Sequence, residues 1–179
     1  MRFTLAPISR AEAQEISTWR YAGPYAVYNG NPTSVDSLLR PRFFYHSVHA
    51  ESGELAGYFC FGDDARVAAG KRLGLYEREP ALDVGLGMRP DLTGRGLGEQ
   101  FVRSGLRFAN ETYAPPAFRL TVATFNCRAI RVYEKTGFEP VETFGALSSF
   151  GEREWLLMRR EAQREPPATA MGSDRRAES

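Results

Sequence analysis

The feature that most constrains the fold is the stretch 81–108, which reads ALDVGLGMRPDLTGRGLGEQFVRSGLRF. It begins as an apolar strand, passes through a Pro/Asp/Gly turn and enters a helix whose first residues, from Thr93 to Gly98, are rich in glycine. The first N–H groups of a helix have no internal partner, and the helix dipole adds partial positive charge there. The stretch therefore predicts a strand that feeds into an exposed, positively polarised helix start.

The glycines of this helix start indicate an anion site. Gly94, Gly96 and Gly98 stand at alternate positions, and Arg95 adds a cation between them. Without Cβ atoms, such a loop lets a phosphate or pyrophosphate reach the amides directly. The alternative is that the glycines serve only a tight turn and close helix packing.

Two common phosphate-binding motifs do not fit. A Walker loop needs a Gly-Lys pair followed by Ser or Thr, and the chain has none. The Rossmann fingerprint needs a third glycine three residues after the second, where this chain has Glu99 or Phe101, depending on the register.

Composition bounds the remaining possibilities. With 179 residues and 42% hydrophobic content, the chain is long enough for one domain with a proper core and too short for two ordinary ones. The net charge of +1, without a Lys/Arg-rich run, argues against a nucleic-acid partner. No uncharged apolar run approaches the ~20 residues of a membrane span, and the first residues do not form a signal core. We expect a cytoplasmic protein with no membrane partner.

No metal or disulfide site is expected. Cys60 and Cys127 are far apart and form no CxxC motif, which fits a reducing cytosol. His46 and His49 are separated by an odd number of residues on an expected strand, so they point to opposite faces and do not share a metal.

The other patterns predict an α/β (α+β) single domain, with a mixed sheet covered by helices on both sides. Ser9 and Glu12 make a capping box, and Thr33 or Ser34 caps a short second helix. The expected strands cover 2–8, 43–50, 54–62, 81–88, 118–124, 139–144 and 153–158, and the helices cover 9–19, 33–40, 93–108 and 126–136. Residues 63–80 are expected to form a surface loop near the site. The domain spans 1–163, and the tail 164–179 is expected to be disordered.

Two further stretches carry candidate site residues. The aromatic loop WRYAGPYAVYNGNP contains Trp19, Tyr21, Tyr25 and Tyr28, and it forms either a substrate wall or a plug under the first helix. In NCRAIRVYEKTGFEPV, Asn126 is a good helix cap in any protein, and Tyr133 has apolar neighbours typical of a core residue.

Together these motifs resemble those of the Gcn5-related N-acetyltransferases (GNAT family). The family's Arg/Gln-x-x-Gly-x-Gly/Ala signature matches at Gly96 and Gly98, with Thr93 in place of Arg or Gln. The N-x-x-A-x-x-x-Y-x-K-x-G-F pattern from Asn126 to Phe138 resembles the second half of the signature. The resemblance covers residues 2 to about 160 and implies a mostly antiparallel central sheet, with the strand at 81–88 splayed from the next one.

The resemblance also implies roles for these residues. Acetyl-CoA is the expected co-substrate, with no metal. Its pantetheine arm is expected along the main chain of Leu86, Gly87 and Met88, and its pyrophosphate on the loop Thr93, Gly94, Arg95, Gly96, Leu97 and Gly98. Asn126 is expected to contact the cofactor, Tyr133 to lie near the thioester sulfur, and the aromatic loop to shape the acceptor site.

The implied reaction is attack of a primary amine, from a small molecule or a peptide, on the thioester. An alkyl ammonium has a pKa near ~10.4, so a base or a water relay must remove a proton. Asp83, on the glycine-bearing face of its strand, is the first candidate and Glu142 the second; an inert, Arg-paired Asp83 is the alternative. A homodimer is compatible with the sequence. Two other functions stay open, a silent acyl-CoA sensor and a nucleotide-binding protein.

Overall fold

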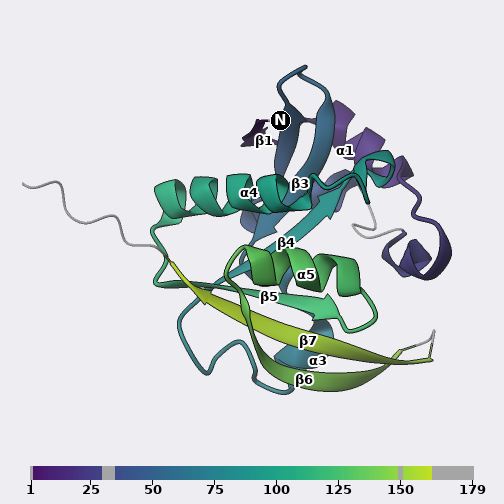
Figure 1. Ribbon diagram of the computed structural model, residues 1–179. Coiled ribbons are helices and arrows are strands. Elements are labelled where there is room, and N and C mark those ends of the chain that lie inside the picture. Colours follow the sequence, from purple (N-terminus) through teal and green to yellow (C-terminus); the bar gives the residue numbers. More distant parts are fainter. Residues whose placement is uncertain (1, 30–34, 149–150, 163–179) are drawn as a thin grey trace, which may run out of the picture.

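In the computed structural model, which describes residues 2–29, 35–148 and 151–162, helices flank one seven-stranded mixed sheet (Figure 1). The strand order is β1-β2-β3-β4-β5-β7-β6. All neighbours are antiparallel except β4 and β5, which are parallel. The strands are β1 (Phe3–Pro7), β2 (His46–Ala50), β3 (Leu55–Phe61), β4 (Leu82–Met88), β5 (Ala117–Ala123), β6 (Glu139–Ser148) and β7 (Gly151–Glu161).

Five α-helices and four short 3₁₀ segments are found among the described residues. They are α1 (Arg10–Thr18), η1 (Gly23–Tyr28), α2 (Val35–Leu38), η2 (Pro41–Phe43), η3 (Asp63–Ala65), α3 (Ala68–Arg72), η4 (Pro90–Leu92), α4 (Gly98–Tyr113) and α5 (Cys127–Lys135). In Figure 1, α4 and α5 lie in front of the sheet. Ser9 and Glu12 form the predicted capping box of α1, and the Asn126 side chain caps α5.

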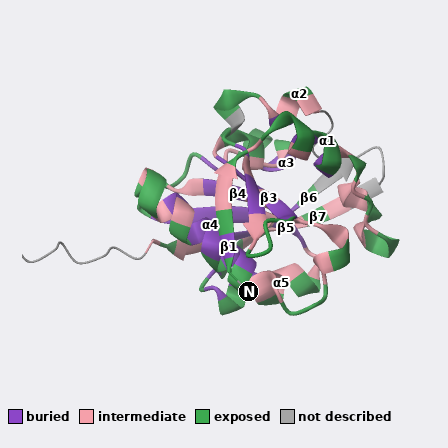
Figure 2. Cartoon of the chain, turned by 90° about the horizontal axis from the view of Figure 1, so that it is seen from above, coloured by how far each residue is buried: buried purple, intermediate pink, exposed green. Residues whose placement is uncertain are grey.

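The alternation of β3 divides the core between the two faces of the sheet. Phe59 stacks on Phe101 of α4, with ring centroids 5.0 Å apart, in the largest apolar cluster. Cys60 belongs to a second cluster, which contains Ile16 of α1. Because successive strand residues point to opposite faces, β3 supplies both clusters. In Figure 2 the buried residues accordingly concentrate on the central strands and the inner side of α4.

The pairing of β4 with β5 ends early, and this creates the main opening of the fold. The two strands are in register only at Leu82 with Phe118 and at Asp83 with Arg119. Beyond that point β4 pairs only with β3, through residues 84–88, while β5 continues beside β7. The two strands therefore splay apart toward their carboxyl ends, as the family resemblance implied.

The predicted order of strands and helices is confirmed, with differences in residues 63–80, in the aromatic loop and at the start of α4. Residues 63–80 were expected to be a loop, but they contain η3 and α3, and they bury Leu75 and Tyr76 in a third apolar cluster. The aromatic loop contains η1. The Thr33 or Ser34 cap and the tail 164–179 lie outside the described residues.

The start of α4 differs from the prediction as well. The helix begins at Gly98 instead of Thr93. Gly94 and Gly96 have φ of +76° and +77°, a left-handed conformation that interrupts a helix and favours glycine. The glycine-rich stretch is therefore a loop that leads into the helix.

Candidate functional site

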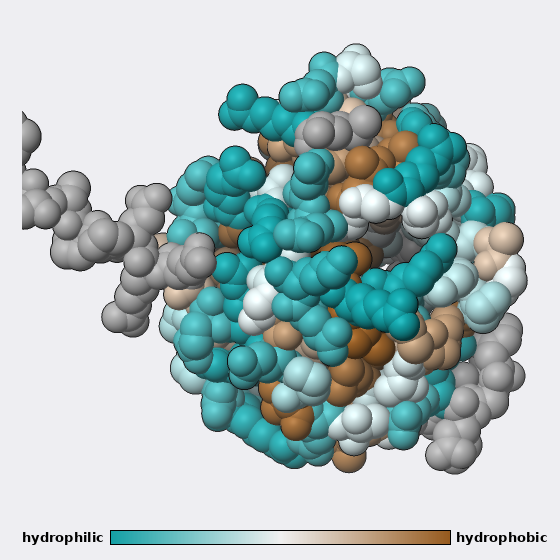
Figure 3. Space-filling model, viewed as in Figure 1, coloured by the Kyte–Doolittle hydropathy of each residue, from teal (hydrophilic) through white to brown (hydrophobic). Residues whose placement is uncertain are grey.

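A cleft of about 840 Å³ opens where β4 and β5 part. Its walls come from β3, β4 and β5, from the loop 93–98, from α5, from η1 and η3, and from the first residues of β7. In the space-filling view, apolar surface is visible in the middle of the face that carries α4 and α5, with hydrophilic side chains around it (Figure 3). The fold thus joins segments from all parts of the described chain around one opening.

The glycines of the loop serve two different purposes. A Cβ on Gly96 would meet nothing within 4 Å, so this glycine is required by its backbone angle and leaves open space above the loop. A Cβ on Gly98 would lie 2.9 Å from Val132, so that glycine allows α4 to pack closely on α5. The close-packing interpretation therefore applies at Gly98, while Gly96 leaves the open space that an anion site would need.

The amino end of α4 is open to an anion. Its N-cap residue, Leu97, provides no side-chain hydrogen bond to the first amides of the helix. Gly94 and Gly96 are exposed beside it. Free N–H groups at a helix start, next to a loop that has glycine at every second position, form the arrangement that phosphate groups favour.

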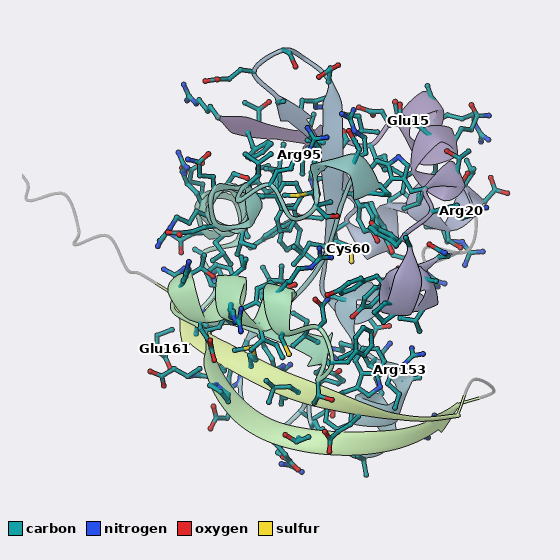
Figure 4. The ribbon with its side chains drawn as sticks, turned by 45° about the vertical axis from the view of Figure 1, so that its right-hand side comes forward. Glu15, Arg20, Cys60, Arg95, Arg153 and Glu161 are labelled. Atoms are coloured by element: carbon teal, nitrogen blue, oxygen red, sulfur yellow. The ribbon has the colours of Figure 1, made fainter. Side chains whose placement is uncertain are left out.

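Two arginines add positive charge near this loop. Arg95 is exposed within the loop itself, and Figure 4 shows where it lies in relation to Cys60 and Arg153. Arg128 was not identified from the sequence, yet its Nη1 atom would lie 3.4 Å from a Cβ on Gly94. The Arg128 guanidinium also lies 4.2 Å from the centre of the Tyr25 ring. The sequence signal that could have identified Arg128 is its position on the first turn of α5, two residues after the Asn126 cap.

The glycine-bearing face of β4 is covered by side chains of β3. Tyr58 lies opposite Gly87, and Cys60 lies opposite Gly85. A Cβ would come within 2.4 Å of the Tyr58 ring at Gly87 and within 2.6 Å of the Cys60 sulfur at Gly85. These glycines therefore make room for neighbouring side chains of β3.

The main chain of β4 nevertheless borders the cleft. Leu86, Gly87 and Met88 line it, and they lie beyond the last residues that pair with β5. The Tyr21 hydroxyl donates a hydrogen bond of 2.9 Å to the Met88 carbonyl, so one acceptor of this segment is already used. The strand edge that faces β5 is the part left for an extended, amide-bearing ligand.

Asp83 has the surroundings of a paired, structural carboxylate. It is 2% exposed, and Arg119 binds both of its oxygens, at 2.6 and 2.9 Å. The Nε atom of Arg66 lies 2.6 Å from the same group. The lining of the cleft does not include Asp83. A general base must reach a substrate proton, and these contacts and this burial prevent that. The geometry thus matches the Arg-paired alternative. Glu142 pairs with Arg78 at 2.5 Å and is likewise absent from the lining.

Tyr133 projects into the cleft from α5. It is 9% exposed, and its ring packs edge-on against Phe138 at 6.1 Å. Its hydroxyl makes no hydrogen bond with the described residues, although almost all of the residue is buried. Burial raises the pKa of Tyr133 well above its ordinary value, and the neighbouring Tyr28 adds to the shift. Tyr133 is therefore a neutral phenol whose proton is available to a ligand.

Asn126 caps α5 and also lines the cleft. Its Oδ1 atom accepts a hydrogen bond of 3.2 Å from the amide N–H of Ala129, and this bond forms the helix cap. Its Nδ2 atom donates to the Tyr28 hydroxyl at 3.3 Å, and the residue lines the cleft. The Asn126 side chain thus connects η1 to α5.

The aromatic residues of the loop fall into two groups: three line the cleft and one packs in an apolar cluster. Tyr21, Tyr25 and Tyr28 line the cleft. Trp19 does not, since it packs on Tyr58 at 6.3 Å within the second apolar cluster. Burial raises the pKa of Tyr21 to about 12, so its hydroxyl remains a donor.

The structure adds side chains to the cleft that the sequence analysis did not name, chiefly Tyr45, Tyr58, Asp64, Arg153 and Trp155. They come from β3, β7 and the segments that precede or follow β2 and β3, and no local motif marks them. Among the described residues, no group of three His, Cys, Asp or Glu is arranged to hold a metal ion. Nor does any described helix have the length and apolar character to cross a membrane.

Solved structures with the same fold include several acetyltransferases. A spermidine N-acetyltransferase chimera, from Vibrio cholerae and a second enzyme, has a TM-score of 0.66 at 15% identity, over 90% of this chain and 96% of that one. The structure of AAC(6')-Ib with ribostamycin and coenzyme A gives 0.65 at 20% identity, over 90% and 94%. A GNAT-family acetyltransferase from Bacillus anthracis gives 0.68 at 10%, over 90% and 96%.

Comparison of sequences gives the family directly. No match was found among curated proteins. The model of the acetyltransferase (GNAT) family matches residues 11–138, which include the glycine loop, Asn126 and Tyr133. With the splayed strands, the open helix start and the buried tyrosine beside them, this match shows that the chain belongs to the GNAT acetyltransferase family.

Proposed function

We propose that this protein transfers the acetyl group of acetyl-CoA to a primary amine. The observation that carries the proposal is the cleft between β4 and β5, whose lining combines a glycine loop at an uncapped helix start with Tyr133, a neutral phenol. Neighbours of this fold include one named for spermidine and one solved with ribostamycin and coenzyme A, which makes a small amine the natural acceptor class.

The chain offers a distinct surface to each part of the co-substrate. The amides of Gly94 to Gly98, with Arg95 and Arg128, would hold the pyrophosphate through charge-assisted hydrogen bonds, since the Thr93 amide already donates to the Pro90 carbonyl. The main-chain edge of Leu86 to Met88 would hold the pantetheine arm as an added strand. The thioester would then lie between the splayed strands, within reach of Tyr133.

In the reaction, the amine nitrogen forms a bond to the acetyl carbon and the bond from that carbon to sulfur breaks. Tyr133 would supply a proton or a hydrogen bond to the departing sulfur, since its raised pKa keeps the phenol protonated. A thiol has a pKa near ~8.5, and a partly apolar cleft makes the thiolate costlier than in water.

Two other functions predict different binding behaviour. A silent acyl-CoA sensor would bind acetyl-CoA without turnover, and a nucleotide-binding protein would prefer ATP or NAD. Calorimetric titrations with the three ligands, followed by a thiol-release assay over a panel of amines, separate them. The proposal requires binding of acetyl-CoA and amine-dependent release of CoA; binding without release on any amine would favour the sensor.

A further inference from the structure

The charges that line the acceptor half of the cleft point to the kind of amine that binds there. We define the cofactor half by the glycine loop, α4 and α5, and the acceptor half by η1, η3 and the start of β7. Seven charged side chains line the cleft. Four of them lie on α4 or α5 and thus in the cofactor half, namely Glu99, Arg128, Arg131 and Lys135. The other three lie in the acceptor half, namely Asp64, Arg66 and Arg153.

Of these three, Arg66 is already neutralised. Its Nε atom binds Asp83 at 2.6 Å, and its Nη1 atom lies 3.8 Å from Asp63 and 3.7 Å from Glu77. The contacts with Asp83, Asp63 and Glu77 raise the pKa of Arg66 against the opposing effect of its burial. Arg66 therefore brings no unmatched charge to a ligand.

Asp64 is a carboxylate with no cation beside it. The Tyr45 hydroxyl donates a hydrogen bond of 2.6 Å to its Oδ2 atom, and no ion pair joins it to any described residue. Tyr45 is buried, so this bond fixes the carboxylate at the edge of the second apolar cluster. A fixed and unpaired carboxylate of this kind is a ready partner for an ammonium group.

Arg153 is the matching cation. Its guanidinium lies 5.6 Å from the Trp155 ring centre, and no carboxylate of the described residues pairs with it. It is close enough to Tyr28 to lower the pKa of that hydroxyl, against the larger raising effect of burial. Figure 4 shows Arg153 at the β7 end of the site, on the other side of Cys60 from Arg95.

The two charges are held apart by the architecture of the sheet. Asp64 precedes Ala65, whose Cα atom would lie 3.3 Å from a Cβ on Gly85 of β4. Arg153 lies on β7, and β5 lies between β4 and β7. No ion pair joins Asp64 to Arg153 among the described residues. Aromatic side chains of Tyr25, Tyr28 and Trp155 line the cleft as well.

From this arrangement we propose that the acceptor is a zwitterionic amine, such as an amino acid, whose ammonium group is received by Asp64 and whose anionic group is received by Arg153. This proposal rests on the proposed function. A polyamine would place a second cation against Arg153, and like charges brought together oppose binding. With the ammonium group held in this way, the Asp64 carboxylate would take up the proton that the attacking amine loses.

Matched pairs of amines test the proposal in the wild-type protein. Tyrosine, tryptophan and lysine are each compared with the amine that lacks the carboxylate, namely tyramine, tryptamine and cadaverine, and spermidine is added. The expected result is a kcat/KM at least tenfold higher for the amino acid of at least one pair. Equal or better use of the carboxylate-free amines or spermidine would overturn the proposal and leave the proposed function standing. Acetyl-CoA binding without turnover of any amine would instead contradict the proposed function.

Two substitutions at Arg153 test whether this residue produces the preference for the amino acid over its carboxylate-free partner. Arg153→Gln should abolish the preference for the amino acid with little change in kcat/KM for its carboxylate-free partner, and Arg153→Glu should reverse the preference. Arg10→Gln, an exposed arginine remote from the cleft, is the matched control and should leave both values unchanged. Asp64→Asn should lower kcat/KM for both members of a pair alike. A loss in Arg153→Gln that is the same for both members of each pair would contradict the assignment of Arg153.

Discussion

At the scale of single residues, environment decides what a side chain can do. Asp83 and Tyr133 were both expected at the reaction centre, and both are buried. Asp83 has its oxygens occupied by Arg119 and Arg66, whereas the Tyr133 hydroxyl has no hydrogen-bond partner among the described residues. Asp83 was chosen because it lies on the glycine-bearing face of its strand, and Tyr133 because of its position in a motif. The hydrogen-bond partners, which the sequence does not display, separate a structural role from a chemical one.

Tyr133→Phe is expected to slow the chemical step. The substitution keeps the ring and its packing on Phe138 and removes only the hydroxyl. We expect kcat to fall on the order of ten- to a thousandfold, with little change in acetyl-CoA affinity, because general acid catalysis is typically worth ~10²–10⁴ and water substitutes in part. Steady-state kinetics beside a melting curve make the measurement. Full activity would show that the tyrosine only packs.

Asp83→Asn is expected to destabilise the fold. Removing one partner of a buried ion pair leaves Arg119, 4% exposed, without its counter-ion. Such changes typically cost about 3–5 kcal/mol in the free energy of unfolding. Chemical denaturation measures this, with Asp36→Asn, an exposed carboxylate on α2, as a control that should change little. A stable Asp83→Asn protein with a specific loss of kcat would restore the catalytic interpretation.

The two cysteines should differ sharply in reactivity. Burial raises the pKa of the Cys60 thiol to about 12 from 9.0, and Asp64 contributes to the shift, whereas Cys127 is exposed. A raised pKa lowers the thiolate fraction at a given pH, here by about three orders of magnitude at pH 8. Iodoacetamide should therefore label Cys127 and spare Cys60 until the protein is unfolded, as mass spectrometry of the peptides can show. Equal labelling of both in the native state would mean that the second cluster is open.

At the scale of elements, local signals predicted most of the secondary structure. The capping box of Ser9 and Glu12 and the Asn126 cap were both read correctly, because each depends on residues within one turn. The start of α4 was placed too early, because glycine permits helical and left-handed angles alike. Residues 63–80 were misjudged since α3 is short and is held by tertiary contacts of Tyr76 with Thr121.

The glycine loop can be tested with a matched pair of substitutions. Gly96→Asp places a carboxylate and a Cβ where the phosphates are expected, so acetyl-CoA binding should fall below detection in calorimetry. Gly53→Asp is the control, because Gly53 has a similar φ of +84°, also has open space around it, and lies in the turn between β2 and β3. The strain of the backbone is shared by both variants. If Gly96→Asp bound acetyl-CoA as Gly53→Asp does, the loop would not be the phosphate site.

The 3₁₀ segment η1 is expected to act on the acceptor. Tyr25→Ala removes a ring that lines the cleft, so the KM of the acceptor should rise severalfold. Because the same ring packs against the Arg128 guanidinium, a smaller loss of acetyl-CoA affinity should accompany that rise. Phe44→Ala, which removes an exposed ring outside the cleft, is the comparison. A large loss of thermal stability in Tyr25→Ala with an unchanged acceptor KM would identify the ring as a plug.

At the scale of the whole molecule, the site is a product of topology. The motifs predicted the fold and the cofactor half, because the glycine loop and α5 carry their signals in short stretches. The acceptor half depends on η1, η3 and β7, which are far apart in the sequence and meet only in the folded sheet. Asp64 and Arg153 have no local pattern to mark them, and only the three-dimensional arrangement reveals them as the unmatched charges of one cleft.

The central claim is that this cleft joins acetyl-CoA to an amine. The most direct measurement is amine-dependent CoA release by the wild-type protein, with the acetylated product identified by mass spectrometry, beside Gly96→Asp and Gly53→Asp under the same conditions. The account predicts an N-acetylated product with the wild type and Gly53→Asp, and none with Gly96→Asp. Product formed equally by all three proteins, or CoA released without any N-acetylated amine, would contradict it.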